Sequence, residues 1–225
     1  YSMRKQTDME IRIPAPAEEI INKLNEHGYE AYVVGGCVRD MLLGREPGDW
    51  DITTSALPGQ VKEVFRRTVD TGIQHGTVTV MMGKEGYEVT TYRIDGEYSD
   101  GRHPNSVEFT PDLVEDLKRR DFTINAMAYN SHTGFVDKFG GVEDLEKGII
   151  RCVGEPMDRF TEDALRILRA IRFSAQLGFS IEERTCEAIK VIAPNMVHVS
   201  KERIQVELTK LLLSSHPDYI SLVYE

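Results

Sequence analysis

The spacing of apolar residues divides the chain into a first part of mixed periodicity and a second part of helical periodicity. Up to about residue 154, short apolar runs alternate with polar turns, which is typical of strands. Four of these runs predict β-strands at Glu30–Val34, Trp50–Thr54, Gly76–Met82 and Tyr87–Tyr92. Only four residues, two of them glycine, separate the last two runs, so these strands are expected to form a β-hairpin. Weaker strand patterns cover Phe135–Asp137 and Ile149–Val153.

Helical patterns surround and then replace the strands. Pro14–Asn25 and Gly59–Arg67 predict helices in the first part. From Pro156 onward every pattern is helical, with helices expected at Met157–Leu177, Ile181–Ile192 and Ser200–Leu213. The sequence therefore predicts an α+β head domain over residues 1–154 and an all-α neck over residues 155–225. No glycine or proline signal follows the last apolar pattern, so we expect a truncated chain.

Composition narrows the classes of function. The chain has 225 residues, with 27 Lys and Arg against 37 Asp and Glu, for a net charge of −10. This excess of acid argues against a nonspecific nucleic-acid coat, but not against a polymerase, whose metal ions supply positive charge. The three cysteines are far apart and lack metal-ligand spacing, which predicts reduced thiols in a cytoplasmic protein. No apolar run is long enough to span a membrane.

The segment from Val34 to Asp51 contains the clearest candidate chemistry. Gly35 and Gly36 follow an apolar run and precede a short helical pattern, so the backbone can approach a phosphate group there. Asp49 and Asp51 are two residues apart, and on a strand they share a face. Two adjacent carboxylates repel each other and favour a bound divalent cation. The combination predicts phosphoryl or nucleotidyl transfer, although a tight turn followed by a solvated strand end would also explain it.

Three motifs occur in an order seen in one family: residues 34–51, residues 119–128 (Arg-Arg-Asp-Phe-Thr-Ile-Asn-Ala-Met-Ala) and residues 162–169 (Glu-Asp-Ala-Leu-Arg-Ile-Leu-Arg). Over roughly residues 14–214 the chain resembles the bacterial class II CCA-adding enzymes, tRNA nucleotidyltransferases closely related to bacterial poly(A) polymerase. The resemblance implies a DNA polymerase beta-like head with a mixed, mostly antiparallel sheet, followed by a helical neck. The family's body and tail domains would then be absent.

The resemblance also implies an activity: template-independent addition of CCA to the tRNA 3′ end from CTP and ATP, by two-metal nucleotidyl transfer with release of pyrophosphate. Because the domains that grip tRNA would be missing, we expect this chain to bind CTP or ATP but to extend tRNA poorly. Poly(A) polymerase or an A-adding tRNA nucleotidyltransferase is the main alternative. A nucleotide-binding regulatory module and a nucleotidyltransferase for small molecules such as antibiotics are weaker ones. The sequence does not indicate the oligomeric state.

Residue roles in the head follow from the same resemblance. Asp49 and Asp51 match the metal-binding pair, which implies Mg²⁺ as cofactor. Glu88, in the neighbouring strand, occupies the position of a third acidic residue, although ordinary strand alternation would also place a glutamate there. Gly35, Gly36 and Arg39 are expected to cradle the triphosphate, because a guanidinium matches phosphate oxygens.

Two further sets of residues are expected to contact the nucleotide. Arg120, Asp121 and Asn125 match the family's ribose-contacting motif; if they lie on a helix, Asp121 and Asn125 share a face, and a helix-anchoring salt bridge is the alternative. On one helix, Asp163 and Arg166 would also share a face, with Arg169 a further turn along.

Asp163 and Arg166 form an acceptor beside a donor. Cytosine and adenine both present an amino group next to a ring nitrogen that accepts a hydrogen bond, so one side-chain pair could select CTP and ATP and reject UTP and GTP. An ordinary ion pair on a solvated helix face is the alternative.

The polar segment Asp95–Ser106 is too long for a tight turn. It resembles the flexible element that the family associates with the switch from C to A addition, which favours a complete CCA- or A-adding activity. The residues that carry this expectation are Arg93, Asp95, Tyr98, Asp100 and Arg102.

Overall fold

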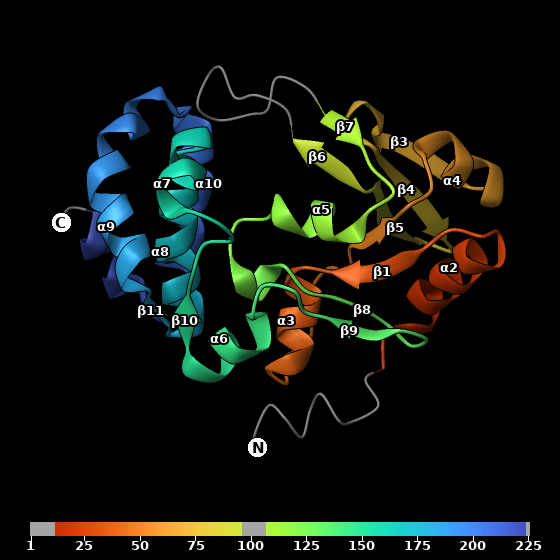
Figure 1. Cartoon of the computed structure of the whole chain (residues 1–225), viewed down its shortest axis with the longest axis horizontal. Coiled ribbons are helices and arrows are strands. Elements are labelled where there is room, and N and C mark those ends of the chain that lie inside the picture. Colours follow the sequence, from red (N-terminus) through yellow and green to blue (C-terminus); the bar gives the residue numbers. More distant parts are fainter. Residues whose placement is uncertain (1–11, 96–106, 224–225) are drawn as a thin grey trace. The chain divides into compact units, whose positions relative to one another are not determined.

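The computed structural model describes residues 12–95 and 107–223, which belong to two compact units (Figure 1). The first unit comprises the described residues of Tyr1–Asp95, together with Val107–Arg120 and Asn125–Val142. The second comprises Asp121–Ile124 and the described residues of Glu143–Glu225. The motif at residues 119–128 therefore contributes to both units.

A seven-stranded sheet forms the centre of the first unit, in the order β3-β4-β5-β2-β1-β8-β9. The pair β2 and β5 is parallel, and every other neighbouring pair in this sheet is antiparallel. The prediction of a mixed, mostly antiparallel sheet is thus confirmed, as is the hairpin of β4 and β5. Its strands are β1 (Ala31–Val34), β2 (Ile52–Thr54), β3 (Thr68–Gly72), β4 (Thr77–Met82), β5 (Glu85–Thr91), β8 (Ala128–Asn130) and β9 (Gly134–Val136).

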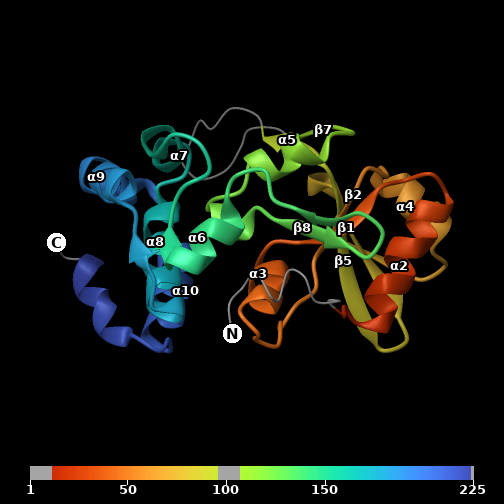
Figure 2. The ribbon, with the colours of Figure 1, turned by 60° about the horizontal axis from the view of Figure 1, so that its bottom comes forward.

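Helices pack on both faces of this sheet, and the central strand β1 is therefore buried on both sides. Tyr32 and Val34 belong to an apolar cluster with Leu113 and Leu117 of α5 (Leu113–Lys118). The opposite face meets α2 (Ala15–Glu26), which buries its own apolar stripe and lies across the sheet from α5 (Figure 2). The other helical elements of this unit are α3 (Gly36–Leu42), α4 (Pro58–Val64) and the 3-10 turn η1 (Ile73–His75). The helix α6 (Gly141–Lys147) and the 3-10 turn η2 (Thr123–Asn125) each contribute residues to both units.

A separate two-stranded ribbon flanks the long polar segment of the first part. It pairs β6 (Arg93–Asp95) with β7 (Val107–Phe109) in antiparallel register. Tyr98, Asp100 and Arg102 of the expected switching element lie outside the described residues.

The second unit is mainly helical. Its elements are α7 (Pro156–Glu162), α8 (Leu165–Leu177), α9 (Glu183–Ile192), η3 (Ala193–His198), α10 (Lys201–Leu212) and η4 (Pro217–Val223), with the paired strands β10 (Ile149–Ile150) and β11 (Ser180–Ile181). Apolar side chains at helical spacing are buried there, namely Phe160, Ala164, Leu168, Ile171 and Ala175. Ser200 begins α10 as predicted, since its hydroxyl accepts a hydrogen bond from the Arg203 amide at 3.3 Å.

Two expectations for the helical part were wrong. The single helix predicted over Met157–Leu177 is two helices, because Asp163 adopts an extended conformation (φ −148°, ψ 101°) and its carboxylate accepts a hydrogen bond from the Leu165 amide at 3.2 Å. A strand also occurs where only helices were expected. Gly178, at φ +70°, ends α8 and turns the chain into β11, which pairs in parallel with β10.

Two further expectations for the first part were also wrong. The strand β3 was missed because Thr68–Gly72 contains one valine, Val69, and that side chain is 49% exposed, so the segment has no apolar alternation. The metal-binding pair was expected on a strand, but Asp49 and Asp51 precede β2, which starts at Ile52. The backbone nevertheless continues the pairing, since the Asp51 carbonyl accepts a hydrogen bond from the Val34 amide at 3.0 Å.

The three cysteines are free, as predicted. Burial raises the pKa of the Cys37 thiol to about 12, with a further contribution from the nearby Asp51 carboxylate, and burial raises that of Cys152 to about 12. Both side chains therefore act as small apolar groups at neutral pH. Among the residues that the structure describes, none of the helices has the length and apolar character needed to cross a bilayer.

Candidate active site

The predicted site residues fall into two groups, one in each unit. The head cluster lies in the first unit and consists of Gly35, Gly36, Arg39, Asp49, Asp51, Glu88, Arg120 and Asn125. The neck cluster lies in the second unit and consists of Asp121, Asp163, Arg166 and Arg169.

A glycine turn connects β1 to α3 and shapes the head cluster. Gly35 has φ +80° and ψ −133°, a conformation that side-chain-bearing residues rarely adopt. Its amide donates to the Met127 carbonyl at 3.1 Å, and its carbonyl accepts from the Val38 and Arg39 amides as α3 begins. The turn therefore fixes the end of β1, the start of α3 and the residue before β8 relative to one another.

Two guanidinium groups lie against this turn. A Cβ atom at Gly35 would be 3.1 Å from Nη1 of Arg120, and one at Gly36 would be 3.4 Å from Nη2 of Arg39. Arg39 is oriented by Asn125, whose Oδ1 accepts a hydrogen bond from Nη1 at 2.7 Å, and by Asp40 at 3.1 Å. The N-terminus of a helix carries roughly half a unit of positive charge, and α3 is a short helix of seven residues, whereas each guanidinium carries a full charge. The arginines are therefore the main source of positive charge at this turn. Gly36 and Arg39, which are expected from the sequence to cradle a triphosphate together with Gly35, lie next to each other.

The carboxylates of the head cluster, all three exposed to solvent, lie near enough to influence one another electrostatically. Desolvation raises the pKa of Asp51, the nearby carboxylate of Glu88 raises it further, Arg120 lowers it, and Asp49 adds a smaller rise. Glu88 lies on β5, which is the parallel neighbour of β2, and Ile52 pairs with Val89 across these strands. Glu88, the third carboxylate proposed from the sequence, therefore lies on the strand next to β2.

These side chains suit a hard divalent cation. Carboxylate oxygens are the ligands that Mg²⁺ prefers, and a cation relieves the repulsion that raises the pKa of Asp51. Among the described residues, no three Asp, Glu, His or Cys side chains converge closely enough to form a complete protein cage. Mg²⁺ usually binds through one or two carboxylates plus substrate phosphates, so Asp49 and Asp51 fit that mode.

Asp116 is a part of the head cluster that the sequence did not reveal. Its carboxylate is 1% exposed and lies 3.6 Å from Nη2 of Arg120. It also accepts hydrogen bonds from the Arg93 amide at 3.0 Å and from the Thr53 hydroxyl at 3.3 Å. Asp116 thus anchors Arg120 to β2 and β6. The spacing of four residues between Asp116 and Arg120 was the available signal, but many exposed helical pairs share it.

The motif that contains Arg120, Asp121 and Asn125 does not form an α-helix. The helix α5 ends at Lys118, and Thr123–Asn125 form the 3-10 turn η2. The expectation that Asp121 and Asn125 share a helix face is therefore wrong, and the two residues belong to different units. Asp121 forms an ion pair with Arg169, whose Nε lies 2.8 Å from Oδ2.

Asp163 and Arg166 also depart from the helical expectation, because only Arg166 is helical. Asp163 is the residue that follows α7, and Arg166 is the second residue of α8. Asp163 pairs with Arg203 of α10 at 2.9 Å, whereas Nη1 of Arg166 donates to Glu162 and to the Arg159 carbonyl, both at 2.9 Å. Both residues are buried, each 8% exposed, which disfavours the alternative of a solvated surface pair.

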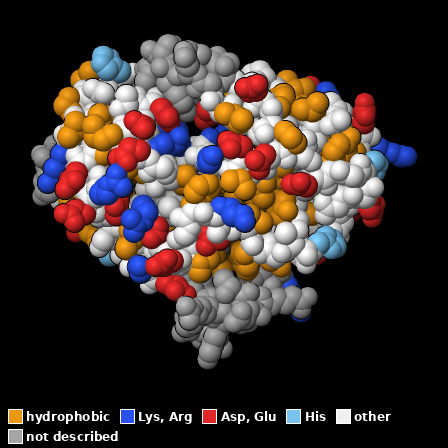
Figure 3. Space-filling model, in the orientation of Figure 1, with side chains coloured by type: hydrophobic (Ala, Val, Ile, Leu, Met, Phe, Trp, Pro, Cys, Tyr) orange, Lys and Arg blue, Asp and Glu red, His pale blue; other side chains and the backbone are white. Residues whose placement is uncertain are grey.

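A buried network of charges connects α8 with α10. Glu207 is 5% exposed, pairs with Arg172, and lies 3.5 Å from Nη1 of Arg169. Burial opposes the charge on Arg169, but Asp121, Glu207 and Asp163 outweigh it and raise the pKa of this side chain. Figure 3 shows that acidic and basic side chains are interleaved over these helices on the face displayed. Arg203 and Glu207 were not identified as site residues from the sequence, because residues four apart on a helix commonly form an ordinary ion pair.

The fold and the head cluster together define a nucleotidyltransferase head domain. The chain belongs to the family described as Poly A polymerase head domain, which it matches over residues 31–151. Residues 178–222 match a second family, described as the probable RNA and SrmB-binding site of polymerase A.

Named relatives agree with this assignment. The chain is 54% identical over 199 residues to the CCA-adding enzyme of Leuconostoc mesenteroides, covering 88% of this chain and 50% of the relative. It is 56% identical over 193 residues to that of Geobacillus thermodenitrificans, covering 86% and 48%. The chain thus spans about half the length of the curated relatives it matches.

Solved structures give the same result. The CCA-adding enzyme of Bacillus stearothermophilus in complex with CTP is similar with a TM-score of 0.81 and 49% identity, covering 89% of this chain and 49% of that one. The Thermotoga maritima CCA-adding enzyme complexed with tRNA is similar with a TM-score of 0.76 and 28% identity, covering 97% and 52%.

The crowding at Asp51 predicts how stability depends on pH. Because the pKa of Asp51 is raised in the folded state, the folded chain binds more protons than the unfolded chain between the two pKa values, and stability falls as pH rises through that window. In the absence of divalent cations, Asp51→Asn is therefore expected to raise the melting temperature at pH 7, with a gain that shrinks toward pH 4. Calorimetry with and without Mg²⁺ measures this.

Glu46→Gln is the control for this prediction, because it removes one negative charge from an exposed position in the same connection between α3 and β2. Mg²⁺ should raise the melting temperature of the parent and of Glu46→Gln but not that of Asp51→Asn. An equal response of all three proteins to Mg²⁺ would contradict the assignment of Asp51 as a metal ligand.

Proposed function

We propose that this chain supplies the catalytic head and the base-selecting neck of a CCA-adding tRNA nucleotidyltransferase. Such an activity adds CCA to the tRNA 3′ end from CTP and ATP without a nucleic-acid template and releases pyrophosphate. The observation that carries the proposal is the head cluster, in which crowded carboxylates adjoin a glycine turn overlaid by two arginines. The names of the relatives favour CCA addition over the poly(A) polymerase alternative.

Asp49 and Asp51 would hold Mg²⁺, and Glu88 would complete the negative site. Such a bound ion polarises phosphoryl oxygens and lowers the pKa of an attacking hydroxyl group. The side chains need not supply a covalent step, because phosphoryl transfer depends mostly on positioning and on charge stabilisation.

The arginines then bind the triphosphate. Arg39 and Arg120 lie over a turn that lacks Cβ atoms, so phosphate oxygens can approach both the backbone and the guanidinium groups. Asn125 orients Arg39 and Asp116 orients Arg120, which reduces the entropy lost on binding. In this arrangement Asn125 contributes through Arg39.

Asp163 and Arg166 select the base. Asp163 accepts from the amino group of cytosine or adenine, and Arg166 donates to the adjacent ring nitrogen. Uracil and guanine place a carbonyl against the carboxylate and an N–H against the guanidinium, at a cost of about 1–3 kcal/mol for each mismatched group. Because Asp163 now pairs with Arg203, and Arg166 with Glu162, the base edge must replace these partners.

Asp121 and Arg169 are assigned a supporting role. Their ion pair occupies both side chains, and Arg169 also approaches Glu207. We infer that Arg169, through Glu207, fixes the position of α8 relative to α10 and so positions Arg166, and that Asp121 orients Arg169. In this interpretation neither Asp121 nor Arg169 needs to contact the ribose. A transferase for small molecules would not need this buried arrangement of charges in the neck cluster.

The proposal is tested with tRNA that lacks its CCA end, CTP and ATP supplied separately, and Mg²⁺. We expect incorporation of C from CTP alone, no incorporation of A until C has been added, and no reaction with UTP or GTP. Gel electrophoresis with labelled nucleotides resolves each added residue. Because the chain spans half of its relatives, extension is expected to be slow and is measured at high protein concentration. Products with A and no C would instead support poly(A) polymerase.

The glycine turn gives a second test. Gly35→Ala and Gly83→Ala both place a side chain at positive φ, at a backbone cost on the order of 1–3 kcal/mol, but only Gly35 lies against Arg120, whereas Gly83 faces open space. Titration calorimetry with CTP and Mg²⁺ should show binding weakened about tenfold or more by Gly35→Ala and unchanged by Gly83→Ala. Equal affinities for the two variants would show that the turn does not bind the triphosphate.

A third test concerns the base. Asp163→Ala and Arg166→Ala should relax the preference for CTP and ATP over UTP and GTP, because each removes one half of the hydrogen-bonding pattern. The discrimination should fall about tenfold or more for each, while the response of the melting temperature to Mg²⁺ stays that of the parent. Competition binding with the four nucleotides measures the preference. Unchanged selection by both variants would refute the assignment.

A further inference from the structure

The strands β3, β4 and β5 lie side by side at one edge of the large sheet (Figure 1). Burial alternates along β4 and β5, as it does when a sheet has one face toward a core and the other toward solvent. Val78, Val80 and Val89 are buried, whereas Thr79 is half-buried and Glu88 is exposed. The helix α4 contacts both strands, and the buried valines form the face toward it. Thr79 and Glu88 therefore belong to an open face.

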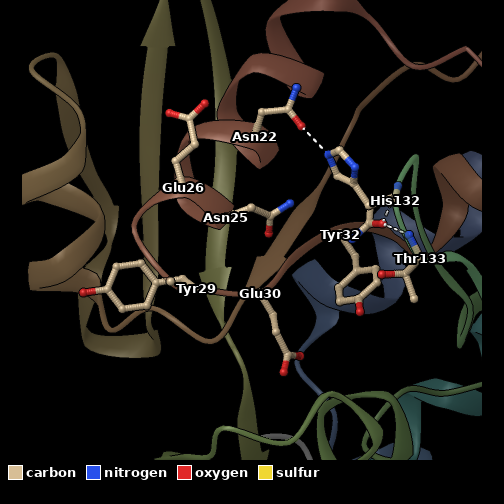
Figure 4. Close-up of a pocket in the computed structure, with 10 residues that line it drawn as sticks. Asn22, Asn25, Glu26, Tyr29, Glu30, Tyr32, His132 and Thr133 are labelled. Atoms are coloured by element: carbon tan, nitrogen blue, oxygen red, sulfur yellow. Dashed lines mark hydrogen bonds between the residues drawn. The ribbon is translucent and has the colours of Figure 1, made fainter.

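The covered face is supported by two helices that contact each other. The helix α4 contacts α2, which in turn packs on β1 and β2. Oδ1 of Asn22 in α2 lies 2.9 Å from Nε2 of His132, which ties this helix to the turn between β8 and β9 (Figure 4). The sheet is thus held from behind, so the open face is preformed and a ligand does not need to order it.

Val69, Thr79 and Glu88 form a row across the open face, which we call the cross-strand row. Val69 pairs with Thr79 between β3 and β4, and Thr79 pairs with Glu88 between β4 and β5. Residues paired across neighbouring strands lie on the same face. Because neighbouring strands are about 4.8 Å apart, Val69 lies roughly 10 Å from Glu88. At its inner end the row reaches the head cluster, since Glu88 is near enough to Asp51 to raise the pKa of that carboxyl.

The chemistry of the cross-strand row changes from its inner to its outer end. The Glu88 carboxylate has neither a hydrogen bond nor an ion pair with another residue that the structure describes. Oγ1 of Thr79 lies 2.7 Å from Oγ1 of Thr71. Two paired hydroxyls use one proton between them, so the second proton and several lone pairs stay available to a ligand. Val69 is apolar and 49% exposed. A carboxylate, a hydroxyl pair and an apolar surface therefore follow one another.

The order of strands separates this row from the expected triphosphate site. In the order β3-β4-β5-β2-β1, the strands β2 and β5 that carry the carboxylate end of the site have β1 on one side and β4 on the other. The glycine turn and its two arginines lie at the end of β1. In nucleotidyl transfer the attacking hydroxyl and the leaving pyrophosphate lie roughly in line, on opposite sides of the reacting phosphorus. A triphosphate on the β1 side therefore leaves the β4 side to the attacking hydroxyl.

We propose that the cross-strand row binds the 3′-terminal nucleoside of the RNA that is extended, an inference that rests on the proposed function. The 2′ and 3′ hydroxyls of a ribose are neighbours. With the 3′ hydroxyl at the carboxylates of Asp51 and Glu88, the 2′ hydroxyl is within reach of Thr79, which hydrogen-bonds to it. The base then extends toward β3 and packs on Val69.

This arrangement accepts any terminal base. Neither a threonine bound to ribose nor a valine against the flat side of a base reads the hydrogen-bonding edge of that base, and contacts with base faces are tolerant of sequence. Such tolerance suits an acceptor end whose last base changes with every nucleotide added. The selective contacts are then left to the neck cluster, where the incoming base is chosen.

The first test uses a short single-stranded RNA and a matched RNA whose terminal nucleotide is 2′-deoxy. Each is titrated into the whole chain and followed by backbone amide shifts. We expect shifts on β3, β4 and β5, and an affinity for the ordinary RNA about threefold to tenfold higher, the contribution of one hydrogen bond. Thr79→Val should abolish this preference and leave CTP binding unchanged. The same preference in the parent and in Thr79→Val would overturn the proposal.

Thr68→Val is the matched control. Thr68 precedes Val69 on β3, so its side chain points to the other face of the sheet. The chemical change is identical, and valine favours strands at both positions, so both variants should fold, which melting curves verify. Thr68→Val should keep the preference of the parent for the 2′ hydroxyl. Its loss in both variants would show that Thr79 does not act through a contact on the open face.

The outer end of the row is tested with Val69→Ala. Removal of two methyl groups from an exposed position should weaken RNA binding about threefold, equally for all four terminal bases, because apolar contact area is lost and no hydrogen bond is. The same titration measures this with four RNAs that differ in the last base. Parent-like affinity for all four RNAs would show that the base does not pack on β3.

Failure of this inference is distinguishable from failure of the proposed function. If the parent, Thr79→Val and Val69→Ala all incorporate C from CTP with the same KM for the RNA, the function stands and the row does not bind the acceptor. If no C is incorporated but the RNA still shifts β3, β4 and β5 with a preference for the 2′ hydroxyl, the function fails and the row remains a site for an RNA end.

Discussion

The backbone conformation of Gly35 is the constraint on which the head cluster depends. At φ +80° and ψ −133° the chain leaves β1, begins α3 and bonds to Met127 before β8, so two consecutive elements and one segment distant in sequence meet at one residue. The missing side chain leaves room for Arg120 on the inner side of the turn. A larger residue would strain the backbone and displace the guanidinium together, so the local conformation and the chemistry of the site cannot be separated.

Opposed charges then fix the arrangement around this turn. The carboxylate of Asp51 is crowded by Glu88 and Asp49 and relieved in part by Arg120, whereas Arg120 itself is anchored by the buried Asp116. Under the proposed function, a cation would bind to the carboxylates and phosphate oxygens to the arginines. The raised pKa of Asp51 predicts that this arrangement costs stability, as is common where charges are assembled for chemistry rather than for packing.

Much of the fold follows from residue patterns, and the failures have identifiable causes. The hairpin, the buried strands and α2 have strong apolar periodicity and were predicted within a few residues. The edge strand β3 has no apolar alternation to detect, and the break at Asp163 depends on one side chain bonding to its own backbone. In the site, paired glycines and carboxylates are visible in sequence. Asp116, Arg203 and Glu207 are not, because their roles come from partners brought together only by folding.

The charge network between α8 and α10 restricts which sequences this fold can accept. Glu207 pairs with Arg172 and lies near Arg169, and Arg169 also pairs with Asp121, so each single removal takes a partner from a charge that is at least partly buried. Single replacements within this set are therefore penalised, while joint replacement by apolar side chains of matching volume is tolerated. Over evolutionary time the members should covary: related sequences keep the whole set or exchange it together.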